Sequence, residues 1–195
     1  VVLHPSDTDL KTIPEAAIRP YPNQYTGTYE VDDQELLIRP IKPEDEPMAV
    51  EFHESLSEQT VKLRYMYNFP LEQRITHERL AALTFVDYDR QIALVALDES
   101  GDETKMVAVA RLKYLSGTKE VGEFGILVSD EYQGQGLGSH LLDRLLAIGK
   151  EEGVKRVFGK LLIQNNKSVE FLHNFGFTTF PLEGEEGILM GAKEL

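Results

Sequence analysis

Apolar and polar residues follow regular spacings along most of the chain, and these spacings predict its helices and strands. Runs that alternate or are continuously apolar are typical of strands, and apolar residues three and four positions apart are typical of helices. Strands are predicted over residues 35–41, 91–97, 105–114, 121–128, 157–163 and 188–193. Helices are predicted from Pro43 through the following EDEPMAVEFHESL, and over residues 57–67, 76–83, 138–152 and 166–175. This order of elements predicts an α/β fold.

The opening segment, residues 1–34, has little periodicity and several prolines, which predicts an extended linker. The globular domain is therefore expected to cover residues 35–195. Because the chain begins at Val1 rather than at a methionine, we expect it to be part of a longer protein.

The longest predicted helix follows directly on a glycine-rich turn, in the stretch VSDEYQGQGLGSHLLDRLL, residues 128–146. Its core-facing stripe consists of apolar residues at helical spacing, namely Leu137, Leu141, Leu142, Leu145, Leu146 and Ile148. The turn itself fits neither common nucleotide fingerprint. A dinucleotide turn, G-x-G-x-x-G, would need a glycine where Ser139 stands, and a triphosphate loop would need a lysine after the glycines.

What remains is a row of main-chain N–H groups left unshielded by Gly134, Gly136 and Gly138 at the first turn of a helix. Such a turn is suited to an anion, because unpaired amide donors and the positive end of the helix dipole point at it. A tight turn without any ligand is the alternative interpretation.

Charge and composition narrow the possible partners. The chain has 20 Lys and Arg against 33 Asp and Glu, a formal net charge of −13, which argues against nucleic acid or an anionic membrane as a partner and favours basic partners. It has no cysteine, and its five histidines lack the H-E-x-x-H spacing, so no metal site is predicted. No apolar run is long enough to cross a membrane and no signal peptide is visible, so we expect a cytoplasmic protein.

The glycine turn resembles the Q/R-x-x-G-x-G/A motif of the Gcn5-related N-acetyltransferases (GNAT), through Gln133, Gly134, Gly136 and Gly138. The resemblance covers about residues 36–195. It implies the GNAT fold, a mixed and mostly antiparallel sheet whose strands splay where acetyl-CoA enters, flanked by helices. It also implies acetyl-CoA as co-substrate, with its pyrophosphate held by the turn, that is by Gln133, Gly134, Gln135, Gly136, Leu137, Gly138 and Ser139.

Further coenzyme contacts are implied by the same resemblance. The strand before the turn would pair its main chain with the pantetheine arm at Ile126, Leu127 and Val128. The stretch QNNKSVEFLHNFGF resembles the family's N-x-x-A-x-x-L-Y-x-x-x-G-F, so Asn165 and Ser168 would also contact the pantetheine. In many relatives a tyrosine of this motif protonates the leaving thiolate, but Leu172 stands at that position here.

Glu123 is the candidate general base. Strand alternation puts it on one face with Gly125 and Leu127, and a carboxylate on an otherwise apolar strand is expected to be desolvated, which suits proton abstraction. In related acetyltransferases a glutamate near this place is the proposed base. The competing carboxylates are Glu120, Asp87 and Asp89, and an exposed, non-catalytic Glu123 is the alternative.

Three stretches outside the coenzyme motifs resemble the catalytic domain of bacterial protein lysine acetyltransferases fused to an NDP-forming acyl-CoA synthetase-like region. They are residues 17–25, 36–65 and 76–97. This resemblance implies that residues 1–34 end such a preceding region, and that the substrate is the active-site lysine of acetyl-CoA synthetase, which is inactivated. Two alternatives stay open, a small-amine acetyltransferase and a non-catalytic acyl-CoA-sensing module, which would not need Glu123.

Overall fold

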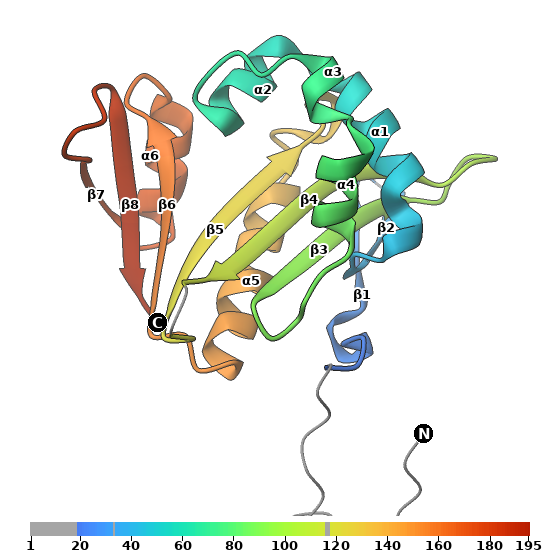
Figure 1. Ribbon diagram of the computed structural model, residues 1–195, viewed down its shortest axis with the longest axis horizontal. Helices are drawn as coiled ribbons and strands as arrows, with labels where there is room; N and C mark the ends of the chain where they lie inside the picture. The colour runs from blue at the N-terminus through green and yellow to red at the C-terminus, as the bar shows by residue number, and fades with distance from the viewer. Residues whose placement is uncertain (1–18, 33, 116–117) are drawn as a thin grey trace, which may run out of the picture.

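The computed structural model describes residues 19–32, 34–115 and 118–195. Its described strands form one sheet in the order β1-β2-β3-β4-β5-β6-β8-β7, with helices on both faces (Figure 1). The strands are β1 (Gly27–Val31), β2 (Gln34–Pro40), β3 (Gln91–Asp98), β4 (Lys105–Tyr114), β5 (Val121–Val128), β6 (Arg156–Leu162), β7 (Thr178–Pro181) and β8 (Ile188–Glu194). All neighbours pair antiparallel except β5 and β6, which are parallel.

The helices divide between the two faces of the sheet. In front of the sheet in Figure 1 lie α1 (Glu46–Ser55) and α4 (His77–Thr84), and α5 (Leu137–Glu151) passes behind it. The short helices α2 (Glu58–Tyr65) and α3 (Leu71–Arg74) connect α1 to α4, and α6 (Asn166–Asn174) joins β6 to β7. Single 3-10 turns occur at Asn23–Tyr25, Pro43–Asp45 and Asp130–Tyr132.

Two hydrophobic cores fix these layers. The apolar stripe of α5 is buried against one face of the central strands, together with Leu36, Leu94 and Leu112. The opposite strand residues, such as Val95 and Leu127, pack under α1 and α4. Each fully buried leucine or valine contributes roughly 1.5–3 kcal/mol by leaving water, so the alternation of the strands determines which helix covers which face.

Each strand and helix predicted from periodicity is present, with ends shifted by a few residues at most. The predictions omitted β1, β7 and α3. Strand β1 shows why, since two of the five residues in its sequence GTYEV are exposed and it has too little apolar alternation to stand out.

The linker prediction for residues 1–34 is wrong for its described end. Residues 27–31 form strand β1, which pairs with β2, and Tyr25 is buried in the core. The sheet therefore begins before residue 35. The first eighteen residues of that segment lie outside the described ones.

The parallel pair β5 and β6 creates the opening that matters for function. The two strands pair only from Val121 with Arg156 to Glu123 with Phe158, and then diverge, as Figure 1 shows. The ends of β5 and β6 beyond Glu123 and Phe158 are therefore free to line a groove.

Candidate active site

A groove of about 290 Å³ lies where β5 and β6 diverge. One wall is β5 from Phe124 to Val128, and the other is β6 from Gly159 to Leu161. Helix α2 closes one side through Thr60 and Leu63, and α6 closes another through residues that include Asn165 and Ser168. Six of the residues predicted to bind the coenzyme line this groove, namely Ile126, Leu127, Val128, Gln133, Asn165 and Ser168.

The main chain of β5 presents only alternate residues to the groove. In an antiparallel ladder every second residue exchanges hydrogen bonds with its neighbour. Ser129 donates to Val107 of β4, so Leu127 also faces β4, whereas the amides of Ile126 and Val128 face the groove. The main-chain role expected for the whole triplet therefore suits Ile126 and Val128. Leu127 reaches the groove with its buried side chain instead.

The glycine turn leaves a row of free amides, as its spacing predicted. Gly134 and Gly136 have φ of 77° and 85°, values that favour glycine, and Gly136 is the N-cap of α5 with no side-chain cap. The N–H groups of residues 134–139 donate to no acceptor within the described parts of the chain. Since no side chain caps the helix by accepting a hydrogen bond, these amides and the positive end of a fifteen-residue helix can bind an anionic group.

Side chains around the turn hold it against α2. The side chain of Gln133 donates to Thr60 Oγ1 and to the carbonyl of Val128, both at 3.0 Å. Asp130 accepts from the Ser57 amide at 2.9 Å and from the Ser57 and Thr60 hydroxyls. Burial raises the pKa of Asp130, but these hydrogen bonds outweigh it and hold that pKa below its usual value. The charged carboxylate thus fixes α2 beside the glycine turn.

On the opposite wall, Asn165 caps α6. Its side-chain oxygen accepts from the Ser168 amide at 3.1 Å, which leaves the amide NH₂ available to a ligand. Leu172 is buried and lines the groove at the position of the family's tyrosine, so the groove wall there carries no acid.

Glu123 lies at the vertex where β5 and β6 separate, but its environment differs from the expected one. Its side chain is exposed rather than desolvated. Its cross-strand partner is Lys113, and it does not line the groove itself. The three competing carboxylates lie in surface ion pairs, Glu120 with Lys155, Asp87 with Arg90 and Asp89 with Lys119.

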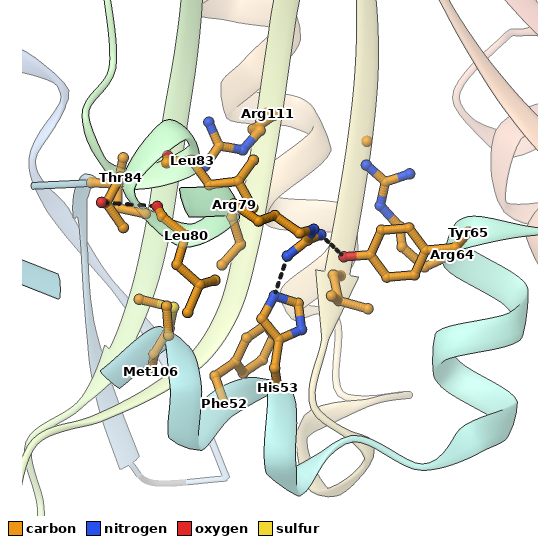
Figure 2. Close-up of a pocket in the computed structure, with 15 residues that line it drawn as sticks. Phe52, His53, Arg64, Tyr65, Arg79, Leu80, Leu83, Thr84, Met106 and Arg111 are labelled. Carbon is orange, nitrogen blue, oxygen red and sulfur yellow. Dashed lines mark hydrogen bonds between the residues drawn. The ribbon is translucent and has the colours of Figure 1, made fainter. Parts of the chain in front are cut away.

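A second cavity, of about 120 Å³, adjoins the groove and was not predicted from the sequence. Arg64, Arg79, Arg111 and Tyr65 line it together with apolar residues of α1 and α4, and Figure 2 shows the three guanidinium groups around it. These arginines come from α2, α4 and β4, which lie far apart in sequence. Of the three, only Arg111 could have been noticed from the sequence, because it places a charge within the largely apolar strand VAVARLKY.

The described residues contain no group of three or more His, Asp or Glu side chains arranged to hold a metal ion. None of the described helices has the length and apolar character needed to span a membrane.

Comparisons with known proteins agree with this geometry. Residues 50–177 match the Acetyltransferase (GNAT) family. Acetyltransferase PA5475 of Pseudomonas aeruginosa is 27% identical over 128 residues, which span 65% of this chain and 66% of that protein.

Solved structures of similar fold include the GNAT domain of PAT from S. lividans. It has a TM-score of 0.79 at 23% identity, covering 90% of this chain and 99% of that one. PaiA N-acetyltransferase from Thermoplasma acidophilum, in complex with coenzyme A, has a TM-score of 0.65 at 18% identity, with 82% and 99% covered. At these identities the similarity shows a shared fold.

Proposed function

Because this chain belongs to the GNAT family of acetyltransferases, which take their acetyl group from acetyl-CoA, we propose that it transfers acetyl to protein lysine side chains. The observation that carries this proposal is the groove between β5 and β6, which ends at the free amides of the glycine turn. The turn suits the pyrophosphate, and the groove suits the narrow pantetheine arm between Ile126, Val128 and Asn165. Gln133, Gln135, Leu137, Gly138 and Ser139 complete the turn, and Ser168 completes the wall.

Transfer in this groove needs a proton to leave the lysine amine before or during its attack. The amine nitrogen forms a bond to the thioester carbon, and the carbon–sulfur bond breaks to release the coenzyme thiolate. We assign Glu123 as the base, taking the proton directly or through a water, since its exposed position at the vertex admits solvent. A main-chain N–H of β5 polarises the thioester oxygen.

The departing thiolate needs no tyrosine in this scheme. Leu172 provides no proton, but a thiolate whose parent thiol has a pKa near that of cysteine, about 8.5, is a good leaving group. A proton from solvent then completes the coenzyme product.

The proposed protein substrate is acetyl-CoA synthetase, whose active-site lysine would be acetylated and the enzyme inactivated. Support comes from the sequence resemblance, and from the similarity of fold to a PAT acetyltransferase domain. The net charge of −13 favours docking of a basic surface. In this proposal a preceding acyl-CoA synthetase-like region ends before β1 rather than at residue 34, and the protein acts in the cytoplasm.

The test compares the wild type with Glu123→Gln, Gly136→Glu and Glu120→Gln. Each protein is incubated with acetyl-CoA and acetyl-CoA synthetase, lysine acetylation is followed by intact mass, and acetyl-CoA binding is measured by calorimetry. We expect Glu123→Gln to bind acetyl-CoA normally but to lower kcat by about 10²–10⁴-fold, the usual contribution of a general base. Gly136→Glu should lose binding, because it adds a carboxylate to the turn and forces a side chain against Tyr29 at a backbone conformation that favours glycine.

Glu120→Gln is the matched control, since this carboxylate lies on the surface and pairs with Lys155. It should retain full activity. Equal rates for Glu123→Gln and wild type would refute the base assignment. If the wild type binds acetyl-CoA yet acetylates neither the synthetase nor small amines, the sensing-module alternative replaces the enzyme. If it acetylates small amines alone, the protein-lysine assignment is wrong.

A further inference from the structure

The cavity beside the groove concentrates positive charge in an otherwise acidic protein. Arg64, Arg79 and Arg111 line it from different sides, together with apolar residues that include Phe52, Leu80 and Met106 (Figure 2). The chain as a whole carries 33 acidic residues against 20 basic ones. Acidic side chains are therefore abundant, and their absence from this cavity calls for an explanation.

None of these three arginines forms an ion pair with a carboxylate of the described residues, although the charge of Glu123 acts on Arg64 from beyond ion-pair distance. By contrast, ion pairs with carboxylates are formed by Arg19, Arg39, Arg90 and Arg156. Arg79 donates to the carbonyl of Arg74 at 2.8 Å and to Tyr65 Oη at 2.9 Å.

The other two arginines are also held only by neutral groups or by none. Arg111 donates to the Leu83 carbonyl and to Gln91 Oε1. Arg64 donates no hydrogen bond to any described residue, and its nearest aromatic neighbour is the ring of Tyr65, with Cζ 5.6 Å from the centroid.

Gathering unpaired cations in a partly buried cavity is unfavourable. Withdrawal from water disfavours the charged form, and like charges repel. Burial, with repulsion from Arg64, lowers the pKa of Arg111 to about 10, and burial also lowers that of Arg64. An arginine guanidinium nevertheless stays charged at neutral pH. An anion in the cavity would offset both costs, which is the usual reason for clustering arginines.

The position of the cavity connects it to the acetyl transfer. Arg64, Gly125 and Leu127 line both the cavity and the groove. A Cβ built on Gly125 would lie 2.1 Å from Arg64 Nη2, so the guanidinium occupies the space beside β5 that a side chain would fill. Strand alternation puts Glu123 on this same face. A group bound in the cavity therefore lies on the face from which an acceptor would approach the groove.

From these contacts we propose that the acceptor substrate carries a carboxylate near its reactive amine, and that Arg64, Arg79 and Arg111 bind this carboxylate. The inference rests on the proposed acetyl transfer and specifies its substrate class. The planar guanidinium fork matches a carboxylate, and the apolar floor accommodates the carbon atoms that bear it. A polyamine would be repelled by the same three charges.

This carboxylate has two possible sources. It belongs either to an acidic side chain flanking the target lysine in a protein, or to a free amino acid that is itself the acceptor. Two matched pairs of acceptors distinguish them: a lysine peptide flanked by glutamates against the same peptide with glutamines, and free lysine against lysinamide.

The measured quantity is the ratio of kcat/KM within each pair, at constant ionic strength. We expect the wild type to prefer the carboxylate member of one pair by about tenfold or more, the effect typical of a charge-assisted hydrogen bond. Arg64→Gln should bring that ratio close to one, and Arg64→Lys should restore it in part. Arg90→Gln, a change at an exposed arginine outside the cavity, should leave the ratio unchanged.

Propionate provides a readout that does not depend on catalysis. The melting temperature of the wild type should be higher in propionate than in chloride at the same ionic strength. This difference should disappear in Arg64→Gln. If no acceptor is acetylated but propionate stabilises only the wild type, the proposed function fails and the carboxylate site stands. Equal kcat/KM within both pairs, or a propionate effect that persists in Arg64→Gln, would overturn the inference.

Discussion

At the scale of single residues, His53 shows how the cationic cavity affects stability. Its ring lies 5% exposed on α1, with Nδ1 unpaired among the described residues and Nε2 3.4 Å from Arg79 Nη1. Burial, and then repulsion from Arg79 and Arg74, lowers the pKa of His53 to about 3. The histidine is therefore neutral in the folded protein at every pH near neutrality.

This shift predicts a loss of stability in mild acid. Below its ordinary pKa of about 6.5, the imidazole takes up a proton in the unfolded chain but not in the folded one, so the free energy of unfolding falls as the pH falls. Relative to His53→Gln, the wild type should lose about 2 kcal/mol between pH 7.5 and pH 5. Urea unfolding at both pH values measures this difference.

The control for His53 is His173→Gln, because His173 is exposed. That variant should keep the pH dependence of the wild type. If the unfolding free energies of wild type and His53→Gln change equally with pH, the pKa of the buried imidazole is not lowered by folding.

At the scale of elements, the turn that starts α5 requires glycine for two different reasons. Gly134 and Gly136 both have positive φ, which costs another residue roughly 1–2 kcal/mol. A Cβ on Gly134 would meet nothing within 4 Å, whereas one on Gly136 would lie 2.7 Å from Tyr29 Oη. Substitution at either position would therefore strain the backbone, but only substitution at Gly136 would add a steric clash.

We therefore expect Gly136→Ala to destabilise the protein more than Gly134→Ala. Gly134→Ala should cost about 1–2 kcal/mol of unfolding free energy, and Gly136→Ala about 1–3 kcal/mol more, as for an overpacked site. Adding Tyr29→Phe to Gly136→Ala removes the clashing oxygen and should recover part of that excess. Urea unfolding measures each loss, and Tyr29→Phe alone completes the double-mutant cycle with wild type, Gly136→Ala and the double variant. Equal losses for Gly134→Ala and Gly136→Ala would contradict the prediction.

At the scale of the whole molecule, an ion pair joins the start of the described chain to the C-terminal end of α5. Arg19 donates to both carboxylate oxygens of Glu152, at 2.6 and 2.5 Å, and Tyr25 donates to one of them at 2.8 Å. Arg19 and Glu152 are 133 residues apart. The hydrogen bond from Arg19 lowers the pKa of Glu152 against the effect of burial, so the carboxylate is charged at neutral pH.

Glu152→Gln should reduce the unfolding free energy by about 1–3 kcal/mol, because a partly buried arginine then loses its charged partner. Glu194→Gln is the control, since Glu194 pairs with Arg156 at 3.4 Å on the surface, where such pairs contribute roughly 0–1 kcal/mol. Thermal and urea unfolding at pH 7 compare the two variants. Similar losses of unfolding free energy in the two variants would show that the Arg19–Glu152 pair contributes no more than a surface ion pair.

The sequence by itself determined the elements whose signal is local. Leu137, Leu141 and Leu145 predicted the buried face of α5, and the spacing of Gly134 and Gly136 predicted a turn with free amides, because helical period and backbone conformation depend on residues close in the chain. Strand β1 was missed because its pairing with β2, rather than its own apolar pattern, makes it a strand.

Only the tertiary structure decided how distant residues meet. Arg64, Arg79 and Arg111 share one cavity because α2, α4 and β4 pack together, and no spacing in the sequence encodes that. Glu123 is exposed in the folded protein, which strand alternation did not predict, and the direction of the Leu127 amide follows from its pairing with β4. The burial of a side chain and the charges around it depend on how the sheet and helices pack. The carboxylate-binding role proposed for the arginine cavity could therefore be inferred only from the fold.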